Sequence, residues 1–325
     1  VPSYDYYFYS SGQDFLDAIP PVAARFAARG FTSTTVLGTA DPMAIRQTID
    51  VIHARALANN HPRLPFIVLV GSAYEDVADP RNIVGTWYFN GPDYLECWWG
   101  CASDAKLMDG YDNDDVPNLP WTRILGTTLG DIQRSVRAAN YFYSGQNVGP
   151  ARAVFISGDR DANWVVQPEP SQTLDGIAGL YSGKQIPVTM LYSRNFAGTN
   201  YAGLHDALVA AMSAGVTELV GTGWVSNAWK VPGNFFQRTY APRFEIVDIP
   251  RAQLFVAELP GCGLGGEDRF APAGEGQSIM ERFMLADPDL QSTAVAWFGH
   301  RRGGTIDNHL RLAQRYFQAR IAVRD

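Results

Sequence analysis

Short runs of β-branched and aromatic residues alternate with longer stretches of helical periodicity along the chain. In its first part, residues 32–37 and 65–71 have the length and composition of buried strands. Asp41-Pro42 opens a helix between them, because Asp is a favoured N-cap and Pro is favoured at the first helical position. The other elements predicted here are strands at residues 4–9 and 121–125 and helices at residues 13–29 and 130–143.

The alternation restarts after residues 144–150, which combine Gly, Ser, Asn and Pro as a linker does. The strands predicted beyond this point are residues 151–157, 186–192, 217–220, 253–258 and 293–298, and the helices are residues 171–181, 201–214, 278–285 and 308–319. The pattern predicts an α/β fold of two subdomains, residues 1–147 and 148–325, the second a largely parallel sheet flanked by helices.

Three strands of the second part end in small or polar residues. The three ends are Gly221-Thr222-Gly223, Gly261-Cys262-Gly263 and Gly299-His300. In open, largely parallel sheets, functional sites gather just beyond the carboxyl ends of the strands. Glycine at these ends lets the backbone turn sharply and leaves its N–H groups free to point at a ligand. The sequence therefore predicts a functional site at this edge of the second sheet.

Composition and charge narrow the class of protein. Of the 325 residues, 46% are hydrophobic and 18% are charged, which is typical of a globular chain. The net charge of −7 argues against a nucleic-acid partner, because a phosphate backbone requires a basic face. No apolar stretch approaches the roughly eighteen residues of a membrane span. The first residue is Val1, so either a leader has been removed or the chain is a piece of a longer one.

Several motifs follow one another in a recognisable order. In the first part, the helix from Asp41 leads to Pro65-Phe-Ile-Val-Leu-Val-Gly71, and an acidic loop precedes a strand at residues 121–124. The motifs of the second part are residues 215–224 with Trp229, residues 254–262 with Gly266 and Phe270, the helix at 278–283 and the strand at 293–297. Through these motifs the chain resembles the gingipain family of secreted cysteine peptidases, and the resemblance implies a caspase-like sheet in the second subdomain.

The resemblance places Cys262 at the nucleophile of the family and Thr222 at the position of its catalytic His, within a Gly-His-Gly turn. Cysteine peptidases need an imidazole that deprotonates the thiol and later protonates the leaving amine. A threonine hydroxyl is not a usable base at neutral pH. Losing one member of such a catalytic unit typically costs on the order of 10⁴-fold in rate. The departure at Thr222 predicts the loss of most peptidase activity.

Two interpretations stay open. In the first, the chain is a degenerate peptidase that serves as an extracellular binding or structural module. In the second, it is an active cysteine endopeptidase in which Cys262 is the nucleophile, His300 replaces the missing base, and N–H groups of the glycine turns, Gly223 among them, stabilise the oxyanion. His300 is alternatively a surface residue at a strand end. The family has a supporting acid near Asp159, which without the His becomes a turn residue or a helix cap.

Further residues are candidates for the walls of the site. The resemblance places Trp224 where the family has a small polar residue, so Trp224 is expected to fill part of the former substrate site. Trp229 and Gly263 are the other substrate-binding candidates, and core packing is the alternative for both tryptophans. The partner expected at such a site is a peptide or a protein.

The remaining predictions concern metals, disulfides and location. Asp112, Asp114 and Asp115 supply oxygen ligands that suit a structural calcium ion, with a solvated acidic turn as the alternative, and no other cofactor is expected. Cys97 and Cys101 are close enough to form a disulfide, although three reduced cysteines fit equally well. The resemblance implies a bacterial protein that is secreted or attached to the cell surface, as part of a larger surface protein or assembly.

Overall fold

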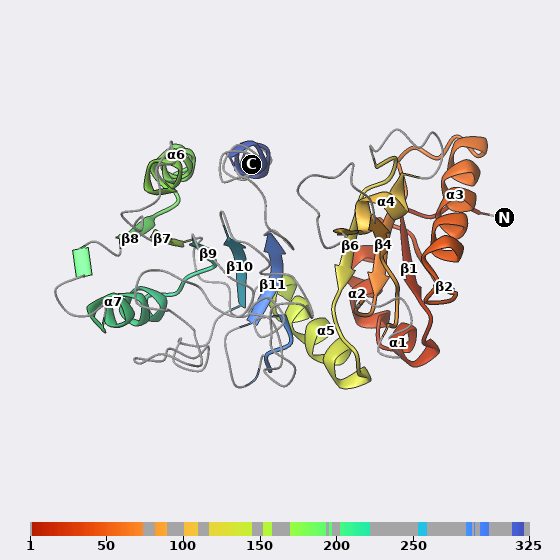
Figure 1. The fold of residues 1–325 in the computed structure, drawn as a ribbon, viewed down its shortest axis with the longest axis horizontal. Helices are drawn as coiled ribbons and strands as arrows, with labels where there is room; N and C mark the ends of the chain where they lie inside the picture. Colours follow the sequence, from red (N-terminus) through yellow and green to blue (C-terminus); the bar gives the residue numbers. More distant parts are fainter. Residues whose placement is uncertain are drawn as a thin grey trace. The chain divides into compact units, whose positions relative to one another are not determined.

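The chain divides into two units, Val1–Tyr143 and Ser144–Asp325, each of which is described by itself. The computed structural model, drawn in Figure 1, describes residues 2–73, 82–89, 101–109, 117–144, 152–157, 170–192, 195–196, 202–221, 253–258, 284–287, 289, 293–298 and 314–321. Both units are built on a parallel sheet flanked by helices. The α/β fold predicted from the sequence is confirmed.

The sheet of the first unit has the strand order β2-β1-β3-β6. Its strands are β1 (Tyr6–Ser10), β2 (Ser33–Leu37), β3 (Phe66–Val70) and β6 (Trp121–Ile124), and every neighbouring pair is parallel. The helix predicted to open at Asp41 is α3 (Pro42–Ala58). The Asp41 carboxylate accepts hydrogen bonds from the backbone N–H groups of Met43 at 3.3 Å and Ala44 at 3.2 Å, as an N-cap does.

Other elements of this unit differ from the prediction. The single helix expected at residues 13–29 is interrupted, and forms α1 (Gln13–Asp17) and α2 (Pro20–Ala27). Pro20 and Pro21 lack the N–H groups that would continue α1, and proline is tolerated only in the first turn of a new helix. The antiparallel pair β4 (Trp87–Phe89) and β5 (Cys101–Ser103), and the short α4 (Asp104–Met108), were not predicted.

Helices cover both faces of this sheet. On one face, isoleucines of α3 and apolar residues of α4 pack against side chains of β1 and β3, among them Tyr9 and Leu69. On the other face, α1, α2 and α5 (Leu129–Ser144) pack against Phe8 and Val68. Successive residues of one strand thus face opposite cores, so these strands read as continuous apolar runs without alternation.

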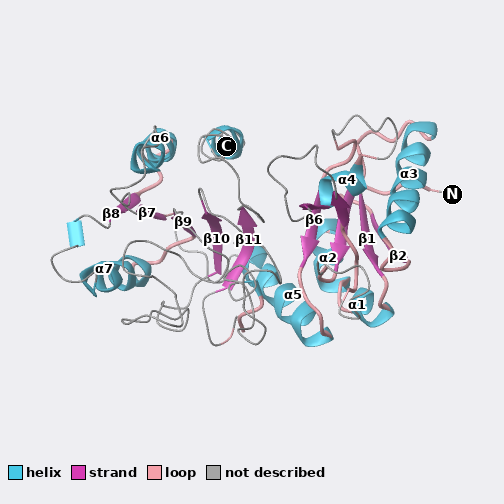
Figure 2. Ribbon diagram, in the orientation of Figure 1, coloured by secondary structure: helices cyan, strands magenta, loops and turns pink. Residues whose placement is uncertain are grey.

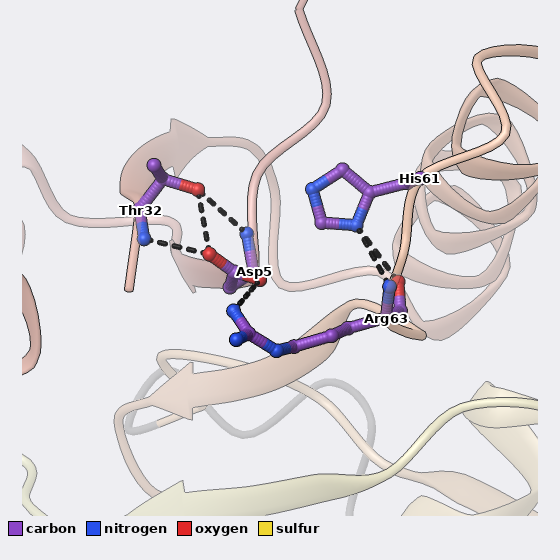
Figure 3. Close-up of polar contacts among 4 residues, drawn as sticks. All are labelled: Asp5, Thr32, His61 and Arg63. Carbon is purple, nitrogen blue, oxygen red and sulfur yellow. Dashed lines mark hydrogen bonds and ion pairs between the residues drawn. The ribbon is translucent and has the colours of Figure 1, made fainter. Parts of the chain in front are cut away.

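A polar cluster joins three loops at the amino ends of the first strands (Figure 3). Asp5 is 6% exposed, and its carboxylate accepts hydrogen bonds from Thr32 N–H at 2.7 Å and the Thr32 hydroxyl at 2.9 Å. Arg63 pairs with the same carboxylate at 3.1 Å and lies 4.9 Å from the ring centroid of Phe31. Burial raises the pKa of Asp5, but these hydrogen bonds and the charge of Arg63 outweigh it, so its pKa lies below the usual value of 3.8.

The sheet of the second unit has the strand order β11-β10-β9-β7-β8, again with parallel neighbours throughout. The strands are β7 (Ala153–Ser157), β8 (Val188–Tyr192), β9 (Glu218–Gly221), β10 (Gln253–Glu258) and β11 (Thr293–Phe298). Figure 2 shows α6 (Pro170–Gly183) and α7 (Ala202–Ser213) on opposite sides of β7 and β8. A helix at residues 314–321 joins α6 on its face of the sheet, where Phe317 and Ile321 pack against Phe155 and Val220.

Candidate active site

Four strands of the second unit end at one edge of its sheet. Backbone pairing aligns Ile156 of β7, Gly221 of β9 and Glu258 of β10 in one row, and Ala257 of β10 pairs with Phe298 of β11. Because all these strands are parallel, the segments that follow them leave the sheet from the same edge. This edge is the one at which ligands bind in open α/β sheets.

The predicted catalytic residues come shortly after these strand ends in the sequence. Thr222 and Gly223 follow β9 directly, and Asp159 and His300 each stand two residues beyond the last residue of β7 and of β11. Cys262 stands four residues beyond the end of β10. All five lie outside the described residues, as do the binding candidates Trp224, Trp229 and Gly263. The strands therefore meet at the predicted edge, while the assignment of these side chains to a site stays a prediction.

The central strand β9 is fully buried and carries a charge. Its residues 218–221 are all buried, and Glu218 is only 1% exposed. One carboxylate oxygen of Glu218 pairs with Arg320 of the helix at residues 314–321 at 3.1 Å, and the other accepts a hydrogen bond from the hydroxyl of Tyr181 on α6. Burial raises the pKa of Tyr316 and the charge of Glu218 adds to this, although Arg320 opposes the shift.

These contacts tie β9 to both helices that cover its face. A charge at 1% exposure is costly unless ion pairs and hydrogen bonds compensate it, and Arg320 and Tyr181 supply that compensation. The cluster lies four residues before Thr222 in the sequence, so it fixes the strand from which the Gly-Thr-Gly turn departs. Sequence reasoning missed Glu218. The available signal was a glutamate inside the otherwise apolar strand Glu-Leu-Val-Gly.

The corresponding edge of the first unit is occupied by structural hydrogen bonds. The hydroxyl of Ser10, the last residue of β1, donates to the carbonyl of Val70 at 2.7 Å. Arg123 of β6 donates to the carbonyl of Gly71 at 2.7 Å and forms a two-pronged ion pair with Asp104 at 2.7 and 2.8 Å. These groups hold the loops after β1 and β3 together, so the described part of this edge serves the fold.

The predicted calcium loop begins at a buried ion pair. Asp109 is 1% exposed and pairs with Lys106, and Arg46 of α3 donates to the Asp109 carbonyl at 2.5 Å. Within the described ranges, no group of three or more potential metal ligands comes together. The predicted ligands Asp112, Asp114 and Asp115 lie outside those ranges, so the calcium site stays a prediction.

The family signature covers nearly the whole chain. The sequence profile of peptidase family C25 matches residues 27–323. The chain belongs to this family. The gingipain-like resemblance is thereby confirmed at the level of the family. A search of curated proteins finds no match for this C25 chain.

Solved structures with the same fold include two of gingipains. The complex of the pro- and mature domains of Porphyromonas gingivalis RgpB has a TM-score of 0.70 at 13% identity, over 97% of this chain and 68% of that one. The Arg-specific cysteine proteinase gingipain R has a TM-score of 0.68 at 14% identity, over 98% of this chain and 67% of that one. A structure described as a protease has a TM-score of 0.69 at 15% identity, over 94% of this chain and 61% of that one. The C25 chain thus spans only 61 to 68% of these proteins.

Among the described residues of the C25 chain, no helix has the length and apolar character needed to cross a membrane. The longest is α3, with 17 residues and an arginine in its last turn.

Proposed function

We propose that this C25-family chain is a catalytically impaired peptidase that binds a peptide or a partner protein outside the bacterial cell. The observation that carries the proposal is Thr222, which stands where the resemblance places the catalytic imidazole. Without that base, the thiol of Cys262 stays largely protonated at neutral pH and the leaving amine receives no proton. The fold retains the edge at which a peptide is held but loses the proton transfers that cleave it.

The sheet topology supports this assignment of the site. β9 and β10 are adjacent and in register up to Gly221 and Glu258, so the segments that carry Thr222 and Cys262 follow neighbouring strands. In the proposed site, the N–H groups of Gly223 and Gly263 bind peptide carbonyls, as nests of free backbone donors do. Trp224 occupies part of the former substrate pocket and Trp229 forms a wall. Asp159, with no imidazole to orient, acts as a turn residue.

The wider setting follows from the family. RgpB has been solved with its pro-domain bound, which supports a protein partner for the present chain as well. We place the chain in a secreted or surface-attached bacterial protein with further domains, in agreement with its coverage of 61 to 68% of its structural neighbours. In an oxidising location, Cys97 and Cys101 form a disulfide. A structural calcium ion is held by Asp112, Asp114 and Asp115.

The active-peptidase alternative rests on one observation. β11 pairs with β10, so the segment with His300 leaves the sheet beside the segment with Cys262. In that alternative, His300 deprotonates the thiol from the opposite side to Thr222. Both assignments use the same nucleophile, and they differ in whether a working base is present.

Restoring the missing imidazole tests the proposal. Hydrolysis of fluorescently labelled casein is compared for the wild type, Thr222→His, Cys262→Ala and the double variant, with circular dichroism as a check on folding. We expect the wild type to match Cys262→Ala. We expect Thr222→His to exceed it by roughly 100-fold, the low end of what a positioned general base supplies, and Cys262→Ala to abolish that gain.

Labelling of Cys262 with iodoacetamide across about pH 5 to 9 separates the two assignments, because only the thiolate reacts. An impaired site labels slowly at acidic pH, at the rate of an ordinary thiol. Fast acidic labelling, together with wild-type hydrolysis that is lost in both Cys262→Ala and His300→Ala, would contradict impairment and establish the alternative.

A further inference from the structure

The first unit buries a lysine against an aspartate. Lys106 of α4 is 8% exposed, Asp109 just beyond the end of α4 is 1% exposed, and the Nζ of Lys106 donates to the Asp109 carboxylate. The two residues between them, Leu107 and Met108, are buried in the core that α4 shares with isoleucines of α3. Lysine and aspartate are rarely buried this far, because taking both charges out of water is costly.

The cation of this pair differs chemically from the one that meets Glu218. Glu218 pairs with Arg320, and a guanidinium keeps its proton in proteins. A lysine ammonium can lose its proton, and the neutral amine is then a nucleophile. The hydrogen bond between Lys106 and Asp109 is the route for that proton. Its transfer to the carboxylate turns the buried ion pair into an amine that faces a carboxylic acid.

A second carboxyl group stands beside the pair. Arg46 and Asp50 are four residues apart on α3 and therefore lie on the same face of that helix. Arg46 donates to the backbone carbonyl of Asp109 at 2.5 Å, so this face meets the end of α4. Burial raises the pKa of Asp50 and the charge of Asp109 adds to the shift, although Arg46 and His53 oppose it. Asp50 is thus placed to exchange protons with groups at Asp109.

We propose that Lys106 and Asp109 condense to an isopeptide bond in the folded chain, with Asp50 carrying the protons. The lone pair of the Lys106 Nζ attacks Cγ of the protonated Asp109 carboxyl group, and the bond between Cγ and the hydroxyl oxygen breaks. Asp50 gives a proton to the departing hydroxyl, which leaves as water, and takes a proton from Nζ. The products are a neutral secondary amide and one water, so no other reactant is required.

The gain from this bond comes from the two charges that it removes. A buried ion pair is replaced by a neutral amide, and the cost of burying both charges disappears. Ring closure adds little, because the ring joins residues only three positions apart. The bond lies in the first unit, so it is independent of the peptide-binding site proposed for the second.

Intact-mass spectrometry of the reduced and denatured protein, after storage at neutral pH, tests the proposal. We expect the wild type to be lighter than its sequence predicts by the mass of one water. Trypsin should then fail to cleave after Lys106, because the amide carries no charge. Residues 82–123 should appear as one peptide that lacks a water, and fragmentation should locate the loss between Lys106 and Asp109.

Three variants, each checked for folding by circular dichroism, test the roles of the residues. Lys106→Arg keeps the cation but has no amine, so it should retain its full mass. Asp50→Asn leaves both partners in place and should condense at least roughly 100-fold more slowly, the low end of what a positioned proton carrier supplies. Asp17→Asn removes an exposed acid of α1 and is the control that should condense like the wild type.

A different reaction with the same mass change has to be separated from the isopeptide. Asp109 is followed by Gly110, and an Asp-Gly sequence can lose water to form a cyclic imide without any lysine. Hydroxylamine cleaves the imide and leaves the isopeptide intact.

Two results would overturn the isopeptide bond. One is a wild type that keeps its full mass and is cleaved after Lys106. The other is a loss of water that persists in Lys106→Arg, which would identify the imide. Condensation of Asp50→Asn at the rate of the wild type would overturn the assignment of the proton transfers to Asp50.

Discussion

Removing the cation from the buried cluster on β9 is expected to destabilise the second unit. In Arg320→Met, the aliphatic stem keeps its packing, but Glu218, which is 1% exposed, loses its ion pair with Arg320. Breaking a buried pair from one side typically costs 3 to 5 kcal/mol, because a charge is left uncompensated. The side chain of Arg320 is 23% exposed, and Tyr181 still donates a hydrogen bond to Glu218 in the variant. We therefore expect a loss of unfolding free energy at the low end of this range, about 3 kcal/mol.

Hydrogen exchange of the backbone amides in residues 218–221 and 314–321 measures this loss of stability in the second unit alone. A global denaturation curve would instead combine the unfolding of both units. A loss of about 3 kcal/mol corresponds to exchange roughly 150-fold faster for amides that open with the unit. Arg315→Met is the matched control, because Arg315 is exposed on the same helix. In Glu218→Gln/Arg320→Met no buried charge is left alone, so the double variant should cost about 2 kcal/mol less than the sum of the single variants.

Equal acceleration of exchange by Arg320→Met and Arg315→Met would refute this prediction. So would additive effects of Glu218→Gln and Arg320→Met in the double variant. Either outcome would mean that Glu218 is compensated without Arg320, and that the ion pair does not hold β9 against its helices.

Two further predictions concern the first unit. Asp5→Asn should cost roughly 2 kcal/mol at neutral pH, because a buried charged acceptor paired with Arg63 is lost. The pKa of Asp5 is lower in the folded than in the unfolded state, so its contribution to the free energy of unfolding is complete above the unfolded pKa near 3.8 and is lost as the pH falls through the folded pKa. In urea titrations below that folded pKa, the unfolding free energies of the wild type and Asp5→Asn should therefore converge. Gly71→Ala should cost roughly 2 to 4 kcal/mol, because φ is +132° and the new Cβ would lie 2.4 Å from Ile83. Gly30→Ala, with φ +80° and open space, should cost only about 1 kcal/mol by the same titration.

The strands were the elements that the sequence predicted best. Residues 253–258 and 293–298 are strands with the predicted ends, and residues 66–70 form β3 within the predicted 65–71. Strands buried on both faces are continuous apolar runs bounded by glycine or proline, and that signal is local. The cap at Asp41 was predicted for the same reason, because its hydrogen bonds reach only two and three residues along the chain.

The features that sequence reasoning missed depend on partners far away in the chain. Glu218 meets Arg320 across 102 positions and Tyr181 across 37, so no window of sequence contains the cluster. The β4–β5 pair joins two strands of only three residues each, which are too short for a periodic pattern to be read. At the candidate site, the order of the strands in the sheet follows from crossover connections, and the sequence pattern does not encode which strands become neighbours.

The packing of Phe317 into the second core has a consequence for folding during synthesis. The first unit has all its strands by Ile124 and its last helix by Ser144, so it can fold while the rest of the chain is still being translated. The second unit starts its sheet with β7 but needs β10, β11 and then Phe317 and Ile321 to cover it. Its central strand β9 must wait for β10, so apolar surface stays uncovered until almost the whole chain has emerged. Chaperones that act on the nascent chain should therefore associate with the second unit far longer than with the first.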